Sequence, residues 1–369
     1  MNATQHDERN DERYMSLALV LAKRGLGRVW PNPAVGCVIV DGEGHVAGRG
    51  WTQPGGRPHA ETEALRQAGP KARGATAYVS LEPCSHQGKT PPCSQALIDA
   101  GVKRVVSAIE DPDQRVSGAG HAMLKAAGIA VRTNVKAQQA GDLNLGFFAR
   151  VKHNRPQVTL KLATTLDGKI ALTSSESRWI TGERARAHVH LERAQHDAVM
   201  IGIGSAIADD PELTCRLPGI DASRLVRVVV DTKARLSPRS KLALSARVQP
   251  VWLIASPASD AAALRAAGVN VFAAPSDASG IDLSRALNLL AEQGLTRILV
   301  EGGAAIATSL LKAKLVDRLL WYRAPTVMGE GIAAVASLDL SALVEMPRFR
   351  HEETLRLGDD VLETYRAGT

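Results

Sequence analysis

The chain has no long apolar run, few aromatic residues and few cysteines, and each of these absences excludes a class of protein. Its longest apolar stretches, such as 16–22 and 34–40, are much shorter than the roughly 20 residues that a membrane-spanning helix needs. The acidic and basic residues before Tyr14 contain no apolar core of a secretory signal. We therefore expect a cytoplasmic protein without a membrane partner.

Basic residues are in excess, with 45 Lys and Arg against 38 Asp and Glu, but they form no block interleaved with aromatic residues. The net charge of +7 favours anionic partners. Because the chain has only four Phe and four Tyr, its composition does not indicate a nucleic-acid surface. We expect a phosphorylated metabolite and a phosphate-bearing cofactor as partners, and no nucleic acid.

The four cysteines do not indicate a disulfide framework, because disulfides are rare in cytosolic proteins. Cys37 lies in an apolar run and Cys215 has no cysteine near it in the sequence, so we expect both to pack as small apolar residues. Cys84 and Cys93 are separated by eight residues, and this close pair indicates a metal or catalytic site.

A chain of 369 residues is too long for one ordinary domain, and its apolar patterns show an α/β alternation twice. The basic segment 146–156 ends in proline, so we predict domains at 1–148 and 149–369. In the first we predict helices at 14–24, 61–68, 92–100 and 120–127 and strands at 35–40, 45–50, 75–81, 104–109 and 129–132. In the second we predict a mostly parallel sheet with strands at 157–163, 198–203, 226–231, 251–255, 269–273, 297–301 and 318–324.

Three short motifs together predict a zinc site: His59-Ala60-Glu61, Pro83-Cys84 and Cys93. One imidazole and two thiolates supply three tetrahedral ligands and leave the fourth position for water, as in catalytic sites. Zinc lowers the pKa of this water, and Glu61 is placed to take its proton and deliver it to leaving ammonia. The pattern H-x-E…P-C…C is the signature of zinc deaminases of nucleobases and related heterocycles.

The spacing of the cysteines leaves an alternative open. The general signature has two residues between its cysteines, whereas this chain has eight. A structural zinc site takes four protein ligands, and His86 is a candidate for the fourth. Glu61 would then be an ordinary carboxylate on a helix face. Its position two residues after His59 favours the catalytic interpretation, while iron in place of zinc stays open.

The second half contains no complete dinucleotide fingerprint. Residues 201–205 (IGIGS) have two glycines of G-x-G-x-x-G, but position 207 is Ile. The predicted strand 297–301 is more informative, because Gly302 and Gly303 follow it directly and a predicted helix comes next. Glycines at this place bring backbone N–H groups close to an anion such as a pyrophosphate. They are equally compatible with a plain tight turn.

Several motifs resemble one family over nearly the whole chain. They are residues 31–38 (PNPAVGCV), 83–93 (PCSHQGKTPPC), 161–169 (KLATTLDGK), 177–181 (SRWIT), 208–211 (ADDP) and 300–303 (VEGG). In identity and order they are similar to the bifunctional deaminase–reductases of riboflavin biosynthesis. The resemblance implies a cytidine-deaminase-like α/β/α domain followed by a dihydrofolate-reductase-like α/β domain.

The resemblance also implies the reaction. The first domain would use Zn²⁺ to remove the 2-amino group of a diaminopyrimidinone that carries a ribosylamino 5′-phosphate. The second domain would use NADPH to convert the ribosyl group into a ribityl chain. The family tends to associate, so the resemblance implies a homo-oligomer. The residues alone neither distinguish NADPH from NADH nor name the proton donor of the reduction.

Carried over residue by residue, the resemblance implies three groups of contacts. Those to the deaminase substrate are Asn32, His86 and Lys89, although Asn32 between two prolines also suits a turn. Those to NADPH are Ala163, Trp179, Ser205, Asp209, Thr232, Gly303, Ala304, Ala305, Ile306, Ala307, Thr308 and Ser309. Those to the reductase substrate are Lys161, Ser177, Arg193, Leu213, Arg216 and Glu301.

Two other interpretations compete with this one. The chain could be a nucleotide or nucleic-acid deaminase joined to an unrelated domain, or a zinc-stabilised scaffold without catalysis. The long cysteine loop with Lys89 and the matching second half argue against the first. One departure from the family is that Thr62 and Glu63 follow the His-Ala-Glu triad, where the family usually has an apolar β-branched residue. We expect this change to alter the rim of the pocket.

Overall fold

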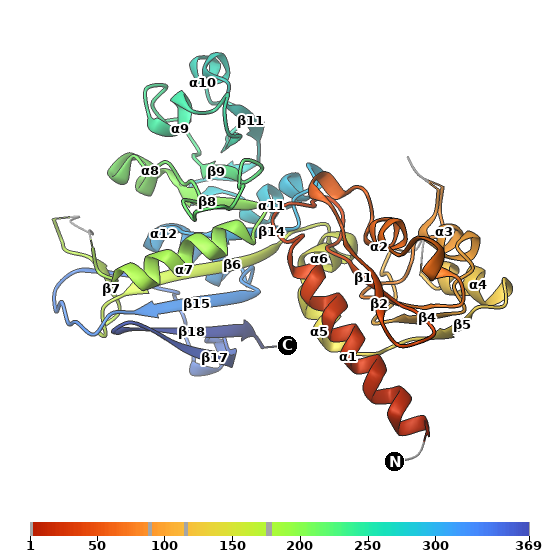
Figure 1. Cartoon of the computed structure of the whole chain (residues 1–369). Coiled ribbons are helices and arrows are strands. Elements are labelled where there is room, and N and C mark those ends of the chain that lie inside the picture. The colour runs from red at the N-terminus through yellow and green to blue at the C-terminus, as the bar shows by residue number, and fades with distance from the viewer. Residues whose placement is uncertain (1–2, 88–90, 114–116, 175–178, 369) are drawn as a thin grey trace. The chain divides into compact units, whose positions relative to one another are not determined.

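The computed structural model describes residues 3–87, 91–113, 117–174 and 179–368. The chain forms two compact units, Met1–His153 and Asn154–Thr369 (Figure 1). The boundary predicted after residue 148 lies inside helix α6 (Leu145–His153), because Phe148 of this basic segment packs against the apolar core of unit 1. None of the described helices combines the length and the apolar character that crossing a bilayer requires.

Within the described residues, unit 1 holds a five-stranded sheet in the order β2-β1-β3-β4-β5. The strands are β1 (Gly36–Val40), β2 (Val46–Trp51), β3 (Thr76–Val79), β4 (Arg104–Ser107) and β5 (Ala130–Arg132). The helices besides α6 are α1 (Ala3–Lys23), α2 (Ala60–Ala68), α3 (Cys93–Asp99), α4 (Ala119–Ala126) and α5 (Ala137–Leu143), with 3-10 turns at Pro54–Gly56 and Gly69–Ala72. Strand β1 is antiparallel to β2 and β3, whereas β3, β4 and β5 are parallel.

Alternation along the strands of unit 1 produces one apolar core on each face of the sheet. Cys37 and Ile39 of β1 pack in the same cluster as Ala64 of α2, together with α3 and α4. Val38 and Val40 point to the opposite face, where they pack with α1 and α5. This arrangement confirms the predicted α/β/α layers and the buried position expected for Cys37.

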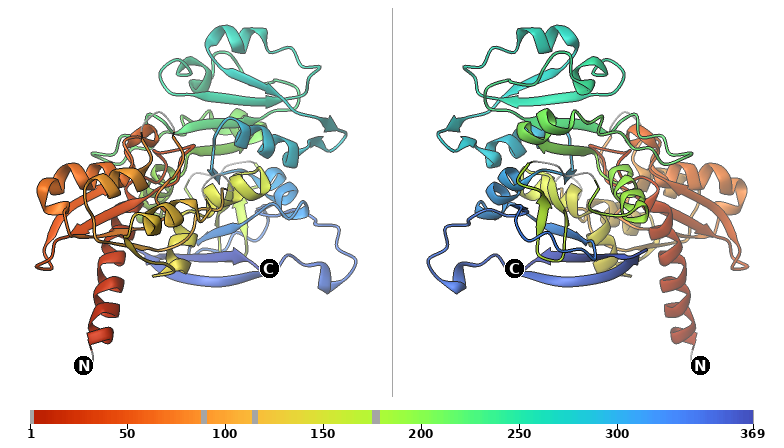
Figure 2. Two further views of the ribbon diagram at one scale, coloured as in Figure 1. Left: turned by 90° about the vertical axis from the view of Figure 1, so that its right-hand side faces the viewer. Right: turned by 90° about the vertical axis from the view of Figure 1, so that its left-hand side faces the viewer.

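Helix α1 begins at Ala3, well before the predicted start at residue 14. Its first turns extend beyond the sheet of unit 1 (Figure 2). They carry no apolar periodicity, but Asp11 is only 1% exposed. Its carboxylate accepts hydrogen bonds from Arg104 at 2.8 and 2.7 Å and from Arg132 at 2.8 Å. Ion pairs of this buried carboxylate with two partly exposed arginines therefore hold the part of the helix that apolar spacing could not predict.

Unit 2 contains a nine-stranded sheet in the order β11-β10-β9-β8-β14-β6-β15-β18-β17, within the residues that the structure describes. Its strands are β6 (Gln157–Thr164), β8 (Ala198–Gly202), β9 (Val226–Val230), β10 (Val251–Ala255), β11 (Asn270–Ala273), β14 (Arg297–Val300), β15 (Arg318–Arg323), β17 (Phe349–Leu357) and β18 (Asp360–Ala367). Two short pairs are β7 (Lys169–Ala171) with β16 (Ile332–Ala333) and β12 (Ser276–Asp277) with β13 (Gly280–Ile281). The helices are α7 (Glu183–Ala194), α8 (Ile203–Asp209), α9 (Lys241–Leu244), α10 (Ala262–Ala267), α11 (Leu283–Glu292) and α12 (Ala304–Lys312), with a 3-10 turn at Leu343–Glu345.

The large sheet is parallel from β11 to β15, as predicted, and ends in an antiparallel hairpin of β18 and β17 that was not predicted. Helix α7 packs on it through Ala185, which shares a cluster with Leu299 of β14 and Leu320 of β15. Helix α8 begins directly after β8, and three residues separate the end of β14 from the start of α12. Because parallel strands end at one edge of a sheet, both helix starts lie at the edge where ligands of such sheets bind.

Candidate active sites

In unit 1, His59, Cys84 and Cys93 bring one nitrogen and two sulfur atoms within 4.8 Å of one another. Nδ1 of His59 lies 3.3 Å from Sγ of Cys93 and 3.7 Å from Sγ of Cys84. These are the donor atoms that zinc prefers, and three of them leave a fourth tetrahedral position for a non-protein ligand. The structure thus brings together the three residues that the motifs predicted to share a metal.

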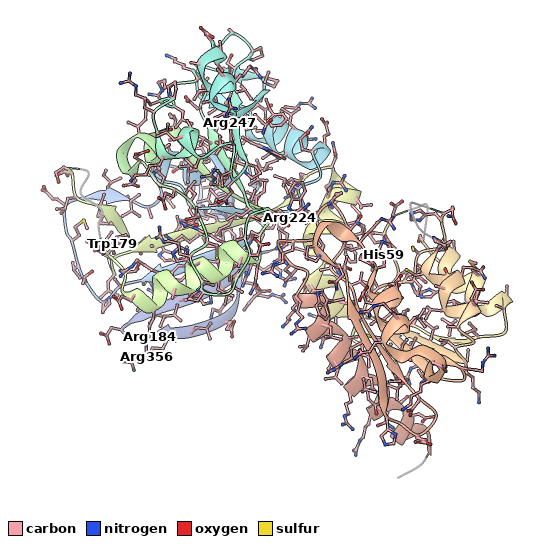
Figure 3. All side chains as sticks on the ribbon, turned by 45° about the horizontal axis from the view of Figure 1, so that its top comes forward. His59, Trp179, Arg184, Arg224, Arg247 and Arg356 are labelled. Carbon is pink, nitrogen blue, oxygen red and sulfur yellow. The ribbon has the colours of Figure 1, made fainter. Side chains whose placement is uncertain are left out.

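Helix starts position two of the three ligands. His59 is the residue directly before α2, and Cys93 is the first residue of α3 (Figure 3 labels His59). Cys84 lies in the segment after β3, and its Sγ accepts a hydrogen bond from the backbone N–H of Cys93 at 3.3 Å. The free N–H groups of a helix start favour negative charge, so α3 favours thiolates at this place.

The two cysteines have opposite proton affinities. Hydrogen bonding from the Cys93 thiol, supported by His59, lowers the pKa of Cys84 to about 4 although burial opposes this change. The same hydrogen bond to Cys84, together with burial, raises the pKa of Cys93. The site therefore holds one thiolate at neutral pH, and a cation at the centre of the three atoms would favour the second.

Glu61 stands in the first turn of α2 and is only 3% exposed. Burial raises the pKa of its carboxyl, and the charge of Cys84 adds to this, while the charge of His59 opposes it. Its carboxyl also forms a hydrogen bond with the Cys93 thiol. A carboxyl with a raised pKa beside a metal site is suited to accept and return a proton near neutral pH.

The expected substrate contacts of unit 1 are only partly brought to this site. Nδ2 of Asn32 donates a hydrogen bond to the carbonyl of Gly56 at 2.9 Å, which ties it to the turn before His59. Gly56 has a φ of +86°, and a Cβ there would lie 2.0 Å from Nδ2 of Asn32, so glycine is required. His86 is exposed, and Lys89 lies outside the described residues.

The departure after the His-Ala-Glu triad lies in the first turn of α2. Thr62 is exposed, and Glu63 forms an ion pair with Arg66 at 3.0 Å. Neither residue is part of the group of possible metal ligands. The expected change at the rim of the pocket stays a prediction.

Unit 2 contains a cleft of about 980 Å³ between the ends of β6, β8 and β14, the starts of α8 and α12, and one side of α7. Thirteen of the residues expected to contact ligands line it: Lys161, Ala163, Trp179, Arg193, Ser205, Asp209, Leu213, Arg216, Glu301, Gly303, Ala304, Ala305 and Ile306. Thr232, Ala307, Thr308 and Ser309 are not among the lining residues, and Ser177 lies outside the described part of the chain. Ala307 and Thr308 are buried, whereas Ser309 is exposed.

A bidentate ion pair crosses the cleft wall from α7 to the end of β14. Nε and Nη2 of Arg193 donate to the two carboxylate oxygens of Glu301 at 2.6 and 2.9 Å, and Nη1 donates to the carbonyl of Thr214 at 2.8 Å. Burial alone would raise the pKa of Glu301, but Arg193 and Lys161 lower it. The carboxylate is therefore charged and fixed in orientation.

Lys161 lies on β6 beside this pair. Burial lowers the pKa of its ammonium group, although the charge of Glu301 opposes the change. Its Nζ stands 6.0 Å from the centre of the Tyr322 ring. A poorly solvated ammonium group at a cleft wall is suited to bind or protonate an oxygen of a ligand.

The glycines after β14 fit a dinucleotide phosphate. A Cβ on Gly302 would lie 1.9 Å from Cγ2 of Ile306, so the close approach of strand and helix requires glycine. The N–H of Gly303 donates to Oγ of Ser205 at 3.2 Å, which joins the starts of α12 and α8. Gly303 and Ala304 line the cleft, where the start of the nine-residue helix α12 favours an anion. Trp179, labelled in Figure 3, is 69% exposed, and Cζ of Arg186 lies over its ring, 4.6 Å from the ring centre.

The cleft wall also contains Arg186 and His190, which were not predicted from the sequence. Together with Arg193 they lie on one side of α7 at separations of four and three residues. This spacing places side chains on one face of a helix and was the signal that could have revealed them. Burial and the charge of Arg193 lower the pKa of His190, so its imidazole is neutral at pH 7.

These two sites define a zinc deaminase domain followed by a reductase domain. Residues 8–109 match the cytidine and deoxycytidylate deaminase zinc-binding region, and residues 156–362 match the RibD C-terminal domain. Over 363 residues the chain is 40% identical to the riboflavin biosynthesis protein RibD of Escherichia coli strain K12, with 95% of this chain and 98% of that protein covered. The RibD protein of Bacillus amyloliquefaciens is 39% identical over 356 residues, with 95% of each chain covered.

Solved structures agree. Form 1 of Acinetobacter baumannii RibD superposes with a TM-score of 0.90 at 38% identity, over 98% of this chain and 100% of that one. A second structure, from Thermotoga maritima, superposes with a TM-score of 0.87 at 34% identity and with the same coverage. It is a diaminohydroxyphosphoribosylaminopyrimidine deaminase/5-amino-6-(5-phosphoribosylamino)uracil reductase. The chain belongs to the RibD family of bifunctional riboflavin biosynthesis enzymes. This confirms the predicted folds, both enzyme activities, and Zn²⁺ and NADPH as cofactors.

Proposed function

We propose that unit 1 removes the 2-amino group of 2,5-diamino-6-ribosylamino-4(3H)-pyrimidinone 5′-phosphate and that unit 2 then reduces the ribosyl group to ribityl. The product is 5-amino-6-ribitylaminouracil 5′-phosphate. The observation that carries this proposal is the convergence of Nδ1 of His59 with the sulfur atoms of Cys84 and Cys93 beside the buried carboxyl of Glu61. The family of the chain supports the choice of substrate.

In unit 1, His59, Cys84 and Cys93 would hold the zinc, and Glu61 moves the protons. Zinc in this site supplies Lewis-acid activation of a water molecule. Glu61 takes a proton from the water as it attacks the carbon that carries the amino group, and it gives a proton to the departing ammonia. Asn32, His86 and Lys89 contact the pyrimidine and its substituents. One water is consumed and one ammonia released in each turnover.

In unit 2, the cleft walls orient the sugar. The residues at the starts of α8 and α12 would hold NADPH, which would supply hydride. The fixed carboxylate of Glu301 accepts hydrogen bonds from sugar hydroxyls, and Arg216 contacts the phosphate. Lys161 and Asp209 face the reacting end of the sugar as polar steering groups. The remaining NADPH contacts are the expected residues that line the cleft, with Trp179 at the exposed rim: Ala163, Ser205, Gly303, Ala304, Ala305 and Ile306.

We also propose that the enzyme works in the cytoplasm and as a homo-oligomer. Both steps use small water-borne metabolites, and no described helix is suited to a membrane. Leu17 and Val20 expose apolar side chains on α1, with exposed fractions of 42% and 61%. A second copy covering this face would remove that surface from water.

An ammonia-release assay with the purified, zinc-loaded chain tests the assignment. The proposal predicts ammonia from the diaminopyrimidinone phosphate without NADPH, and NADPH oxidation only once the deaminated pyrimidine is present. Deoxycytidylate and an RNA oligonucleotide serve as competing substrates in the same assay. Faster ammonia release from either of them than from the pyrimidinone phosphate would show that the substrate has been assigned wrongly.

A further inference from the structure

A second carboxylate near the zinc ligands, that of Glu82, plays no part in the chemistry described above. It belongs to the segment that leaves β3, and Pro83 and Cys84 follow it directly. Its side chain is fully buried, at 0% exposure. Burying an ionised carboxylate is costly unless hydrogen bonds replace its lost water, so the partners of Glu82 decide what it does.

Four backbone N–H groups supply those hydrogen bonds. Oε1 of Glu82 accepts from Gly120 at 2.9 Å and from His121 at 3.3 Å. Oε2 accepts from Gly118 at 3.0 Å and from Asp111 at 3.3 Å. Among the described residues no Lys or Arg pairs with Glu82, and the nearest basic atom is Nδ1 of His121 at 4.0 Å. Burial lowers the pKa of this histidine, so it remains neutral.

These donors come from the start of α4 and the segment before it. The first N–H groups of a helix have no partner within the helix, and Gly118 at the cap position offers no side chain. Glu82 therefore caps α4 from a distant part of the sequence. The contact is tight, because a Cβ on Gly120 would lie 2.0 Å from the carbonyl oxygen of Pro83. The residue before Cys84 is thus packed against the helix that Glu82 caps.

The other side of Cys84 is held by α3. Its carbonyl accepts hydrogen bonds from Oγ of Ser94 at 2.5 Å and from the N–H of Ser94 at 3.2 Å. Ser94 is fully buried and follows Cys93. The backbone of Cys84 is consequently fixed on one side by a buried carboxylate and on the other by a buried hydroxyl. Groups that fix a metal ligand in this way commonly set metal affinity.

We propose that Glu82 is a positioning residue of the zinc site, which sets the metal affinity by holding the backbone of Cys84, with Ser94 as its counterpart on α3. The inference rests on the proposed function in one respect, that His59, Cys84 and Cys93 bind the zinc. Glu82 itself contacts neither the metal nor the substrate. Its effect reaches the metal through two peptide units.

Zinc affinity of the full chain, measured by competition with a chromophoric chelator, tests this inference. Glu82→Gln replaces one acceptor oxygen by an NH₂ group. This group is itself a donor, so it cannot accept the hydrogen bonds of the backbone N–H groups that face it. We expect zinc binding to weaken about 10- to 100-fold and the sulfur-to-metal absorption band of the cobalt-loaded protein to shift. Reduction of the deaminated pyrimidine by unit 2 should keep its rate.

Glu110→Gln is the matched control, because Glu110 also approaches His121, at 3.9 Å, but has a side chain that is 59% exposed. It should bind zinc as the wild type does. Wild-type zinc affinity in a folded Glu82→Gln chain would overturn the inference and leave Glu82 as a helix cap only. A failure of the proposed function would show in the wild type instead. If His59, Cys84 and Cys93 did not bind the zinc, Cys84→Ser would leave the zinc binding of the chain unchanged.

Ser94→Ala keeps the test decisive if Glu82→Gln does not fold. The variant removes the 2.5 Å hydrogen bond to the carbonyl of Cys84 but keeps the one from the backbone N–H. We expect a smaller, several-fold loss of zinc affinity with the same shift in the cobalt spectrum. Unchanged affinity and an unchanged spectrum in Ser94→Ala would overturn the idea that the backbone supports of Cys84 set the affinity.

Discussion

The carboxyl of Glu61 is buried at the start of α2, and burial raises its pKa while the charge of His59 opposes the change. A carboxyl of this kind exchanges protons readily near neutral pH. Glutamine at the same position would keep the volume and the polarity of the side chain but could not transfer a proton. The substitution therefore separates proton transfer from metal binding.

We expect the Glu61→Gln chain to stay folded and zinc-loaded, with ammonia release lowered about 10²- to 10⁴-fold, the usual contribution of general acid–base catalysis. The measurement is ammonia release per zinc, with reduction of the deaminated pyrimidine as an internal reference. Glu63→Gln on the same helix is the control, because Glu63 pairs with Arg66 at 3.0 Å and should be dispensable. If Glu61→Gln released ammonia at a rate within a few-fold of wild type, Glu61 would not be the group that transfers the proton.

Arg216 offers the corresponding test in unit 2, since its side chain is 63% exposed and its removal should not disturb the core. A hydrogen bond to a charged group is worth about 1.5–3 kcal/mol, so Arg216→Ala should raise the KM for the phosphorylated pyrimidine roughly 10- to 100-fold. Arg184→Ala is the control, because Arg184, labelled in Figure 3, is exposed and is not among the residues that line the cleft. If Arg216→Ala impaired ammonia release as strongly as it impaired the reduction, the two sites would not be separate.

At this scale, prediction from sequence succeeds where the chemistry is local in the chain. His59, Cys84 and Cys93 stand in short motifs, and the structure brings them together. Glu82 gave no comparable signal, because its four partners come from the distant segment 111–121 and are backbone groups, which any residue provides. Arg193 was expected from the resemblance, but its pairing with Glu301 follows only from the fold.

At the scale of elements, buried hydrogen bonds join the end of α7 to the sheet of unit 2. His196 follows the end of α7, and its Nδ1 donates to the carbonyl of Glu192 at 2.6 Å. Its Nε2 lies 3.0 Å from Oγ1 of Thr159 on β6 and accepts the hydroxyl hydrogen. Burial, together with the charge of Arg297, lowers the pKa of His196 well below its usual range. The imidazole is therefore neutral in the folded state.

This contact predicts a pH dependence of stability. In the unfolded chain the pKa of His196 is about 6.5, so below that pH the unfolded state binds more protons and the folded state loses stability. The loss should approach about 1.4 kcal/mol per pH unit from this residue as the pH falls further. Urea unfolding followed from pH 7 to pH 5 measures it. His196→Gln should flatten the slope, whereas His86→Gln at an exposed site should not; equal slopes in all three chains would refute the role of His196.

Elements with a clear apolar period were predictable, and elements held by other forces were not. The parallel strands of unit 2 are short apolar segments that are buried in the structure, such as Val226–Val230 and Val251–Ala255. Strand β17 carries Arg350, His351 and Glu352 in a row, all exposed, so it shows no alternation. Strand β17 is held at the edge of the sheet by its pairing with β18, and Leu362 of β18 is buried in the core beside α7.

The whole molecule carries two independent chemistries on one chain. The residues of the zinc site all belong to unit 1, and those of the cleft all belong to unit 2. Removing zinc with a chelator should therefore stop ammonia release while NADPH-dependent reduction of the deaminated pyrimidine continues. Addition of zinc should restore the first activity. Loss of both activities on chelation would show that the metal also supports unit 2.

The central claim is that one zinc ion binds to three protein atoms, beside Glu61, and keeps a position open for water. Anomalous diffraction at the zinc absorption edge from crystals of the loaded enzyme tests this most directly. We expect a single peak about 2.0–2.3 Å from Nδ1 of His59 and from the sulfur atoms of Cys84 and Cys93, with no fourth protein ligand. A peak that His86 also coordinates, or no peak among these three residues, would contradict it.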